Sequence, residues 1–257
     1  MRNLRLCLEY DGTDFHGFQK QPRLRTVQGE LEQVLGRVMG EPIRLIGAGR
    51  TDAGVHATGQ VANFLTDNRI PIKRLPAALN SVLPLDLAVK AADEVELDFH
   101  ARRWAVSRRY QYLLVAQSQP SALLARYAHW VPQALAVREM NQAARYFLGE
   151  HDFCSFQASG SQTRHTVRRV TAASVRRVGR LVVITLEANA FLYQMVRIMV
   201  GTLLQVGMGK FAPERVKAIM ESADRRQAGK TAPARGLCLV RVSYQGKMDA
   251  DQNESYL

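Results

Sequence analysis

The sequence predicts an α+β fold made of two halves with the same order of elements. In residues 1–100, alternating apolar residues typical of strands and apolar residues at helical spacing occur in the order β-α-β-β-α-β. The same order recurs in residues 101–257, with one short extra helix before the last strand. This order defines the ferredoxin-like unit. We therefore expect two domains, residues 1–100 and 101–257, joined into one continuous mixed or antiparallel sheet with a central cleft and helices covering one side.

Each element of the first half has a local signal. Residues 2–10 alternate around Leu4, Leu6 and Leu8 and predict a strand, which ends in a turn at residues 11–14. Thr26 is placed to cap a helix over residues 26–39, whose apolar residues share one face. The remaining elements are expected as strands at residues 42–46, 60–65 and 87–95 and a helix at residues 75–82.

The second half repeats the pattern without convincing sequence identity to the first. Residues 98–108 form the expected connection between the halves. Strands are expected at residues 109–115, 166–175, 181–188 and 237–244, with a turn at residues 178–180. Helices are expected at residues 136–148, 191–206 and 213–220.

The net charge predicts a polyanionic partner. The 257 residues contain 35 Lys and Arg against 23 Asp and Glu, a net charge of +12, and 28 of the basic residues are Arg. Residues 101–200 carry 14 basic and 4 acidic residues, whereas residues 1–100 carry 12 and 13. Because the planar guanidinium suits phosphates and stacks on bases, this distribution indicates that the middle of the chain binds nucleic acid.

Composition excludes several classes of protein. The chain is 47% apolar and 23% charged, which is typical of a globular protein. Its three cysteines are too few and too widely separated for a disulfide framework, and no signal peptide or apolar run of about 20 residues occurs. We therefore expect a cytoplasmic protein that makes no membrane contact. No paired metal-ligand spacing and no Gly-rich loop leading into a helix occurs, so neither a metal nor another cofactor is expected.

The most informative loop spans residues 47–57. It contains three glycines within eight residues, together with Arg50, Asp52 and His56. Because a strand and not a helix follows it, the dinucleotide-binding and P-loop interpretations fail. Two interpretations stay open. Either glycines let a ligand backbone approach Asp52 closely, or the loop is a tight turn in which Asp52 accepts hydrogen bonds from local amides.

Arg197 lies within the most apolar helix. A charge in such surroundings needs an opposite partner, unless the side chain extends from the helix edge to water. Tyr193, Arg197 and Gly201 share one helix face, and Gly201 allows another backbone to come close. We expect Arg197 to pair with Asp52 across the two halves and to hold that carboxylate ionised and oriented.

Two segments combine many arginines with few acids. Residues 102–112 interleave four arginines with aromatic residues, which favours either a phosphate groove with base-stacking platforms or a solvated edge strand. Residues 162–180 contain no acid and favour a polyanion-binding stripe over a merely solvated face. The predicted RNA-binding residues are Arg102, Arg108, Arg109, Arg164, Arg168, Arg169, Arg176 and Arg177.

Several motifs together resemble one known family. The most specific is Gly49-Arg50-Thr51-Asp52-Ala53-Gly54-Val55-His56-Ala57. Further motifs lie at residues 10–13, 17–19, 26–31, 99–102, 107–112, 149–153, 191–197 and 232–237. Through them the sequence resembles the bacterial tRNA pseudouridine synthase A family over nearly its whole length. One departure is Phe18, where relatives often have Trp.

The resemblance implies a homodimer that isomerises uridine to pseudouridine at positions 38, 39 and 40 of the tRNA anticodon stem-loop, after base flipping. Asp52 would be the catalytic nucleophile, attacking C1′, or a base that generates a glycal. Arg197 would be its ion-pair partner. Tyr110 would stack on the base and is a candidate for removing the C5 proton. Arg50, His56 and Leu237 would also bind substrate.

Two alternatives belong to other classes of protein. Tandem ferredoxin-like halves also describe a non-catalytic RNA-binding module that stacks bases on sheet aromatics. The signature of RNA-recognition domains is absent, however, and a pure binder has no use for Asp52 opposite a buried Arg. A metal-dependent RNA hydrolase would need clustered carboxylates, which the sequence lacks.

Overall fold

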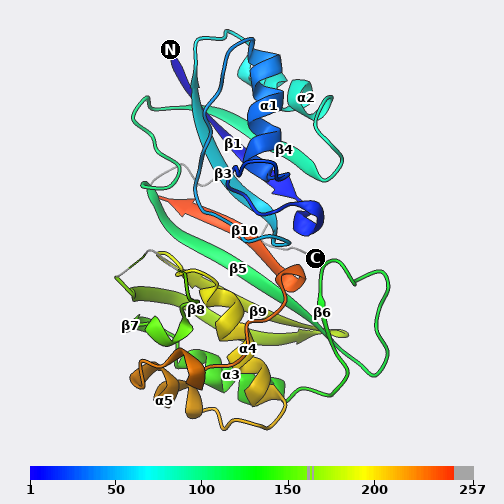
Figure 1. Ribbon diagram of the computed structural model, residues 1–257, viewed down its shortest axis with the longest axis vertical. Helices are drawn as coiled ribbons and strands as arrows, with labels where there is room; N and C mark the ends of the chain where they lie inside the picture. Colours follow the sequence, from blue (N-terminus) through cyan, green and yellow to red (C-terminus); the bar gives the residue numbers. More distant parts are fainter. Residues whose placement is uncertain (161–162, 164, 246–257) are drawn as a thin grey trace. The chain divides into compact units, whose positions relative to one another are not determined.

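The computed structural model describes residues 1–160, 163 and 165–245 of the chain. The chain forms two compact units (Figure 1). Unit 1 comprises Met1–Val106 and the segment that begins at Cys238, and unit 2 comprises Ser107–Leu237. The chain passes from unit 1 to unit 2 between Val106 and Ser107, inside a strand. It returns to unit 1 after Leu237, the first residue of the last strand.

The described residues form ten strands and five α-helices. The strands are β1 (Arg2–Tyr10), β2 (Ile46–Gly47), β3 (His56–Thr66), β4 (Leu87–Val95), β5 (Ala105–Ala116), β6 (His129–Val131), β7 (Gly149–Asp152), β8 (Val167–Val178), β9 (Leu181–Ala188) and β10 (Leu237–Tyr244). The α-helices are α1 (Val27–Met39), α2 (Leu75–Asn80), α3 (Val137–Arg145), α4 (Met195–Gly207) and α5 (Arg215–Glu221). Short 3₁₀ helices cover Gly12–Asp14, Ile72–Arg74, Cys154–Phe156, Arg225–Gln227 and Ala234–Gly236. Strand pairings are both parallel and antiparallel, so the predicted α+β class with a mixed sheet is confirmed.

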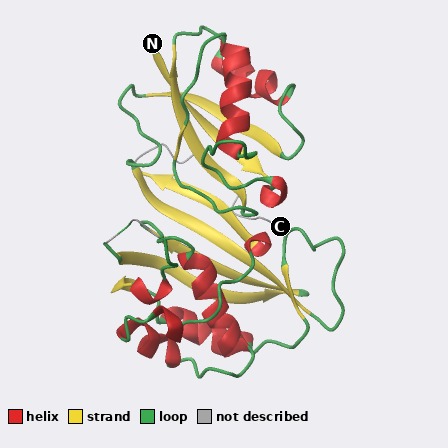
Figure 2. Cartoon of the chain, in the orientation of Figure 1, coloured by secondary structure: helices red, strands yellow, loops and turns green. Residues whose placement is uncertain are grey.

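Unit 1 has the expected ferredoxin-like order β1-α1-β2-β3-α2-β4. Strand β1 lies between β3 and β4, antiparallel to both, and β2 pairs with β3. Leu4, Leu6 and Leu8 are fully buried, and α1 and α2 lie on one side of the strands (Figure 2). Thr26 caps α1 as predicted, because its Oγ1 accepts a hydrogen bond from the Gly29 amide at 3.2 Å.

Unit 2 contains the antiparallel series β5-β9-β8-β7, with β6 parallel to β5. Its core combines Tyr112 and Ile184 of neighbouring strands with Met199 and Leu203 of α4, all at most 1% exposed. Helix α3 packs against β8 and α4. The predicted turn at residues 178–180 is confirmed, with Gly179 at a φ of 56°.

Some element bounds differ from the sequence prediction because tertiary contacts decide them. Strand β3 begins at His56 and not at residue 60, since Ala57 pairs with Tyr10 of β1. Helix α4 begins at Met195 and not at residue 191, since Gln194 has a φ of 56°, outside the helical region. Residues 42–46, predicted as a strand, contribute only Ile46 to β2.

The last strand also has an unexpected neighbour. The element order places β10 at the end of the second half, yet it runs parallel to β3 within unit 1, with Cys238 opposite His56. Strands β6 and β7, of three and four residues, were not predicted, because segments this short show no usable alternation.

Candidate active-site loop and basic residues

The loop that carries Asp52 connects β2 to β3 and is tied to neighbouring segments of unit 1. The Phe18 amide donates to the Thr51 carbonyl at 3.0 Å, and Gln60 Nε2 donates to the Gly49 carbonyl at 3.0 Å. Asp52 itself is half-buried. The two bonds hold the backbone on both sides of Arg50, so the loop presents Asp52 from a defined position.

Tyr10 is a buried support for this loop, a contact that the sequence analysis did not predict. Its hydroxyl lies 2.8 Å from Thr51 Oγ1, and Gln60 Nε2 donates to it at 3.4 Å. Burial raises the pKa of Tyr10, although the hydrogen bonds with Thr51 and Gln60 oppose that shift, so the phenol is neutral. No local signal marks Tyr10 and Thr51 as partners, because 41 residues separate them.

The turn after β1 packs directly against the end of the same loop. A Cβ on Gly12 would lie 2.0 Å from the Val55 carbonyl oxygen, so only glycine permits this approach. His56 is 1% exposed, and its Nδ1 lies 3.0 Å from the Gly12 nitrogen and 3.1 Å from Asp11 Oδ1. An amide can only donate, so Nδ1 accepts from Gly12 and does not donate to Asp11. In this structure His56 supports the turn, and its role in substrate binding stays a prediction.

One predicted binding arginine, Arg50, acts electrostatically on another, Arg102, within unit 1. Arg50 and Arg102 are both exposed. Partial burial of its guanidinium lowers the pKa of Arg102, and the positive charge of Arg50 lowers it further. The fold therefore brings residue 102 near the Asp52-bearing loop, which adds positive potential beside a carboxylate.

Tyr110 and Leu237 are both buried in unit 2. Tyr110 is 8% exposed, and its ring lies edge-on to Phe191 with 5.4 Å between centroids. Leu237 is 5% exposed. The neighbouring Tyr112 hydroxyl donates to the Pro233 carbonyl at 2.8 Å. Burial raises the pKa of Tyr112, and the positive charge of Arg197 opposes that rise. The substrate-binding roles of Tyr110 and Leu237 stay predictions.

Arg197 is half-buried on α4 and holds the chain segment that leads to β10. Its Nε donates to the Ala232 carbonyl at 2.8 Å, and the Ala232 amide donates to the Arg197 carbonyl at 3.0 Å. One turn further along α4, a Cβ on Gly201 would lie only 1.7 Å from the Lys230 carbonyl oxygen. The close backbone approach predicted for Gly201 is therefore confirmed. Tyr193 does not share this helix face as predicted, because it precedes α4, and it is 47% exposed.

The predicted RNA-binding arginines of β5 are engaged within unit 2. Arg109 Nε forms an ion pair with Glu187 Oε2 at 2.7 Å. Arg108 Nη1 donates to the Asn189 carbonyl at 2.8 Å. The two arginines point to opposite faces because neighbouring residues in a strand alternate.

The arginines of β8 do not form one stripe. Arg168 lies opposite His151 and Arg169 opposite Glu150 in the register with β7, so they point to opposite faces. Arg169 also forms an ion pair with Glu150 at 3.0 Å. Exposed Arg176 and Arg177 alternate in the same way. Arg164 lies outside the described residues, and RNA binding by all five arginines stays a prediction.

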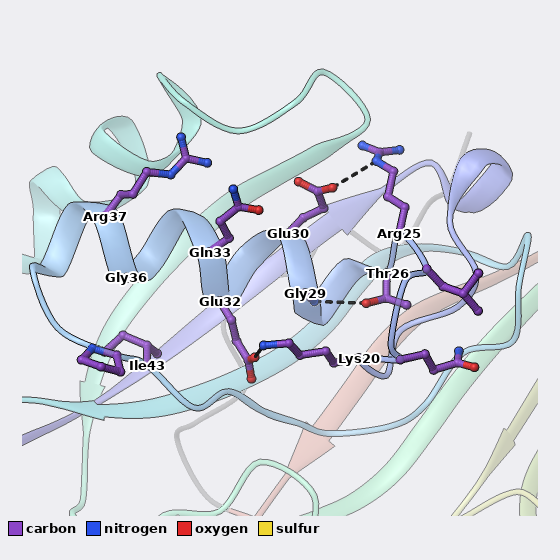
Figure 3. A pocket seen from close by; sticks show the side chains of 13 residues that line it. Lys20, Arg25, Thr26, Gly29, Glu30, Glu32, Gln33, Gly36, Arg37 and Ile43 are labelled. Atoms are coloured by element: carbon purple, nitrogen blue, oxygen red, sulfur yellow. Dashed lines mark hydrogen bonds and ion pairs between the residues drawn. The ribbon is translucent and has the colours of Figure 1, made fainter.

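A groove of about 650 Å³ runs along α1 in unit 1 (Figure 3). Charged pairs line it: Lys20 Nζ lies 3.0 Å from Glu32 Oε2, and Arg25 Nε lies 3.3 Å from Glu30 Oε1. Among the described residues, none of those predicted to bind substrate or RNA lines this groove.

The described residues contain neither a metal-binding cluster nor a helix that could span a membrane. No three His, Cys, Asp or Glu side chains among the described residues are grouped to hold a metal ion. No helix in the described ranges has the length and apolar character needed to cross a membrane.

Comparisons with known proteins match nearly the whole chain. A family model described as tRNA pseudouridine synthase matches residues 6–102 and 143–245. The tRNA pseudouridine synthase A of Acetivibrio thermocellus is 48% identical over 244 residues, 95% of this chain and 100% of that protein. That of Moorella thermoacetica is 49% identical over 243 residues, 94% of this chain and 99% of that protein.

Among solved structures, a Cbf5-Nop10-Gar1 complex matches 91% of this chain and 57% of that chain, with a TM-score of 0.34 and 13% identity. A structural likeness this weak does not assign a family. The family model and the two relatives assign it. By their extent and identity, the chain belongs to the tRNA pseudouridine synthase family, which comprises isomerases that act on uridine in tRNA.

Proposed function

We propose that this chain isomerises uridine to pseudouridine at positions 38, 39 and 40 of the tRNA anticodon stem-loop, with Asp52 as its catalytic carboxylate. The observation that carries the assignment of Asp52 is the anchored loop, whereas the three positions are what the resemblance to the bacterial synthase A family implies. Asp52 is half-buried and follows Thr51, which the buried Tyr10 hydroxyl contacts at 2.8 Å. A reacting group held on a fixed backbone loses little orientational freedom when substrate binds, which lowers the activation free energy.

The chemistry needs one ionised carboxylate. The bond between uracil N1 and ribose C1′ breaks, the base turns, and a bond between C5 and C1′ forms. The C5 proton then leaves and N1 takes up a proton from water, so the product is an isomer of the substrate. Asp52 either attacks C1′ as a nucleophile or removes a ribose proton to generate a glycal. We assign Arg197 as the ion-pair partner that keeps Asp52 charged and oriented. Tyr110 stacks on the flipped base and is our candidate for removing the C5 proton.

The remaining predicted residues bind substrate in this proposal. Arg50 and Arg102 contact phosphates near the flipped nucleotide, and His56 and Leu237 belong to the pocket for the base. The arginines of β5 and β8 contribute to long-range attraction of the tRNA. Their support is the charge distribution, with 14 basic and 4 acidic residues between positions 101 and 200.

We also propose that the protein acts as a homodimer in the cytoplasm. The resemblance to the bacterial synthase A family supports the dimer. The chain has only three cysteines, widely separated in sequence and too few for a disulfide framework, which supports a reducing compartment.

The purified protein, given unmodified tRNA without added cofactor, is expected to form pseudouridine at positions 38, 39 and 40. Carbodiimide modification followed by primer extension maps each product as a stop. A tRNA with cytidine at all three positions is the matched control and should give no stops there. Pseudouridine confined to other positions would contradict the assigned substrate site.

Arg197→Met is expected to lower the rate of pseudouridine formation about 100-fold, because a displaced catalytic group costs roughly that much. Methionine keeps much of the side-chain volume but removes both the charge and the donor to the Ala232 carbonyl. Single-turnover rates and tRNA affinity should be measured together. A fall in rate with tRNA affinity kept within about threefold indicates positioning of the catalytic group. Wild-type rates in Arg197→Met would reject the ion-pair assignment.

A further inference from the structure

The turn of residues 100–104 in unit 1 is held by buried hydrogen bonds to Phe99, just before it, and to Ala101, within it. Asn3 Nδ2 donates to the Phe99 carbonyl at 2.9 Å, and the Ala101 amide donates to Asn63 Oδ1 at 2.9 Å. The Tyr244 hydroxyl donates to the Ala101 carbonyl at 2.8 Å. Strands β1, β3 and β10 therefore each fix this backbone, so the turn is a rigid projection from the unit.

Trp104 is the last residue of this turn, and its ring packs on a buried aromatic residue. Its ring stands edge-on to Phe99, with 5.5 Å between centroids, and Phe99 in turn packs on Tyr244 at 5.2 Å. Phe99 is 2% exposed, whereas Trp104 is 39% exposed. An indole that is held rigidly and left open to solvent offers an apolar surface at small entropic cost on binding.

The surroundings of Trp104 are basic. Arg102 and Arg103 precede it and are exposed. His100 Nδ1 accepts from the amides of these two arginines at 3.3 and 3.4 Å. Burial lowers the pKa of His100, and the charges of Arg103 and Arg102 lower it further. If the turn were only a solvated basic surface, the exposed arginines would be explained. The exposed tryptophan beside them would not be.

We propose that Trp104 is a base-stacking platform for an unpaired nucleotide of the bound tRNA, with Arg102 and Arg103 on the adjoining phosphates. Rigid aromatic side chains flanked by arginines suit single-stranded nucleic acid, since every base has a face on which to stack. A paired stem offers no such face, so the occupant is a nucleotide of a loop. The inference rests on the proposed function for its partner, but it assigns a contact separate from Asp52.

The chain offers a direct spectroscopic test, because Trp104 and Trp130 are its two tryptophans. Trp130→Phe leaves Trp104 as the single indole. In that background, with Asp52→Asn to prevent turnover, titration with unmodified tRNA is expected to quench the tryptophan fluorescence. Stacking of a base on the indole is the physical cause.

Affinity provides the second readout. Trp104→Leu is expected to weaken tRNA binding about tenfold, and Trp104→Phe, which restores an aromatic face, should recover most of it. Leu85→Ala is the matched control, since Leu85 is also an exposed apolar side chain of unit 1. It should leave affinity unchanged.

Absent quenching together with unchanged affinity in Trp104→Leu would overturn the inference. A change in the sedimentation mass of Trp104→Leu, with tRNA affinity unchanged, would also overturn it by assigning the surface to a protein interface. The two proposals fail separately. Normal pseudouridine formation with no effect at Trp104 rejects only the stacking contact, whereas products at other positions reject only the proposed tRNA sites.

Discussion

Replacing Asp52 with asparagine is expected to abolish pseudouridine formation while tRNA binding stays close to that of the wild type. Asparagine keeps the size and hydrogen-bonding shape of aspartate, but it neither attacks C1′ nor accepts a proton from the ribose. The rate should fall by roughly 10⁴-fold or more, as for other lost nucleophiles or bases. Tritium released from uracil C5 measures the reaction, and filter binding measures the affinity.

The matched control is Asp67→Asn, which removes an exposed aspartate from the same unit. Its activity should equal that of the wild type, because the Asp67 carboxylate pairs with the N-terminal amine and lies outside the Asp52-bearing loop. Activity retained in Asp52→Asn would reject the assigned chemistry. Loss of tRNA binding in that variant would instead show that Asp52 acts in binding or folding.

Gly201→Ala is expected to destabilise the protein strongly, although alanine is the better helix former. A Cβ at this position of α4 would lie 1.7 Å from the Lys230 carbonyl oxygen, far inside van der Waals contact. The backbone of Gly229 also lies close, since a Cβ there would lie 2.4 Å from Gly201. Displacing this segment breaks the bonds between Arg197 and Ala232. Overpacking of this kind costs about 1–3 kcal/mol of unfolding free energy.

Gly36→Ala on α1 is the control for Gly201→Ala. Its added Cβ would meet only the Glu41 carbonyl oxygen, at an ordinary 3.6 Å. Alanine should therefore raise the unfolding free energy by about 0.5–1 kcal/mol through helix propensity. Thermal unfolding measures both, at roughly 2–4 °C per kcal/mol for a protein of this size. A Gly201→Ala variant as stable as Gly36→Ala would show that the 229–232 segment moves away freely.

Local patterns were sufficient for most of the fold. Strands β1, β4, β9 and β10 have the bounds that alternation predicts, and Thr26 caps α1 as its position predicts. These features depend on residues a few positions apart, where side-chain periodicity and capping act. For the same reason the Asp52-bearing loop could be selected from its three glycines and its charged residues alone.

The supports of that loop could not be selected in this way. Tyr10 contacts Thr51 across 41 residues, and Gly12 approaches Val55 across a similar distance in sequence. Tyr10 belongs to the motif at residues 10–13, but nothing in that motif predicts which distant residue its hydroxyl contacts. Its role follows from the antiparallel register of β1 and β3, which brings Tyr10 opposite Ala57.

The sequence by itself determined the α+β class, the charge distribution and the family, because each depends on residue types and their local order. Tertiary structure decided how those residues are used. The sequence of residues 162–180 predicts one stripe of arginines. The strand register instead places Arg168 and Arg169 on opposite faces, and Arg169 forms an ion pair with Glu150. Gly201 permits a close approach, but only the fold identifies Lys230 as the neighbour. Short-range steric effects determine secondary structure, so the sequence predicts it. The contact partners of each side chain depend on which distant backbone segments pack together.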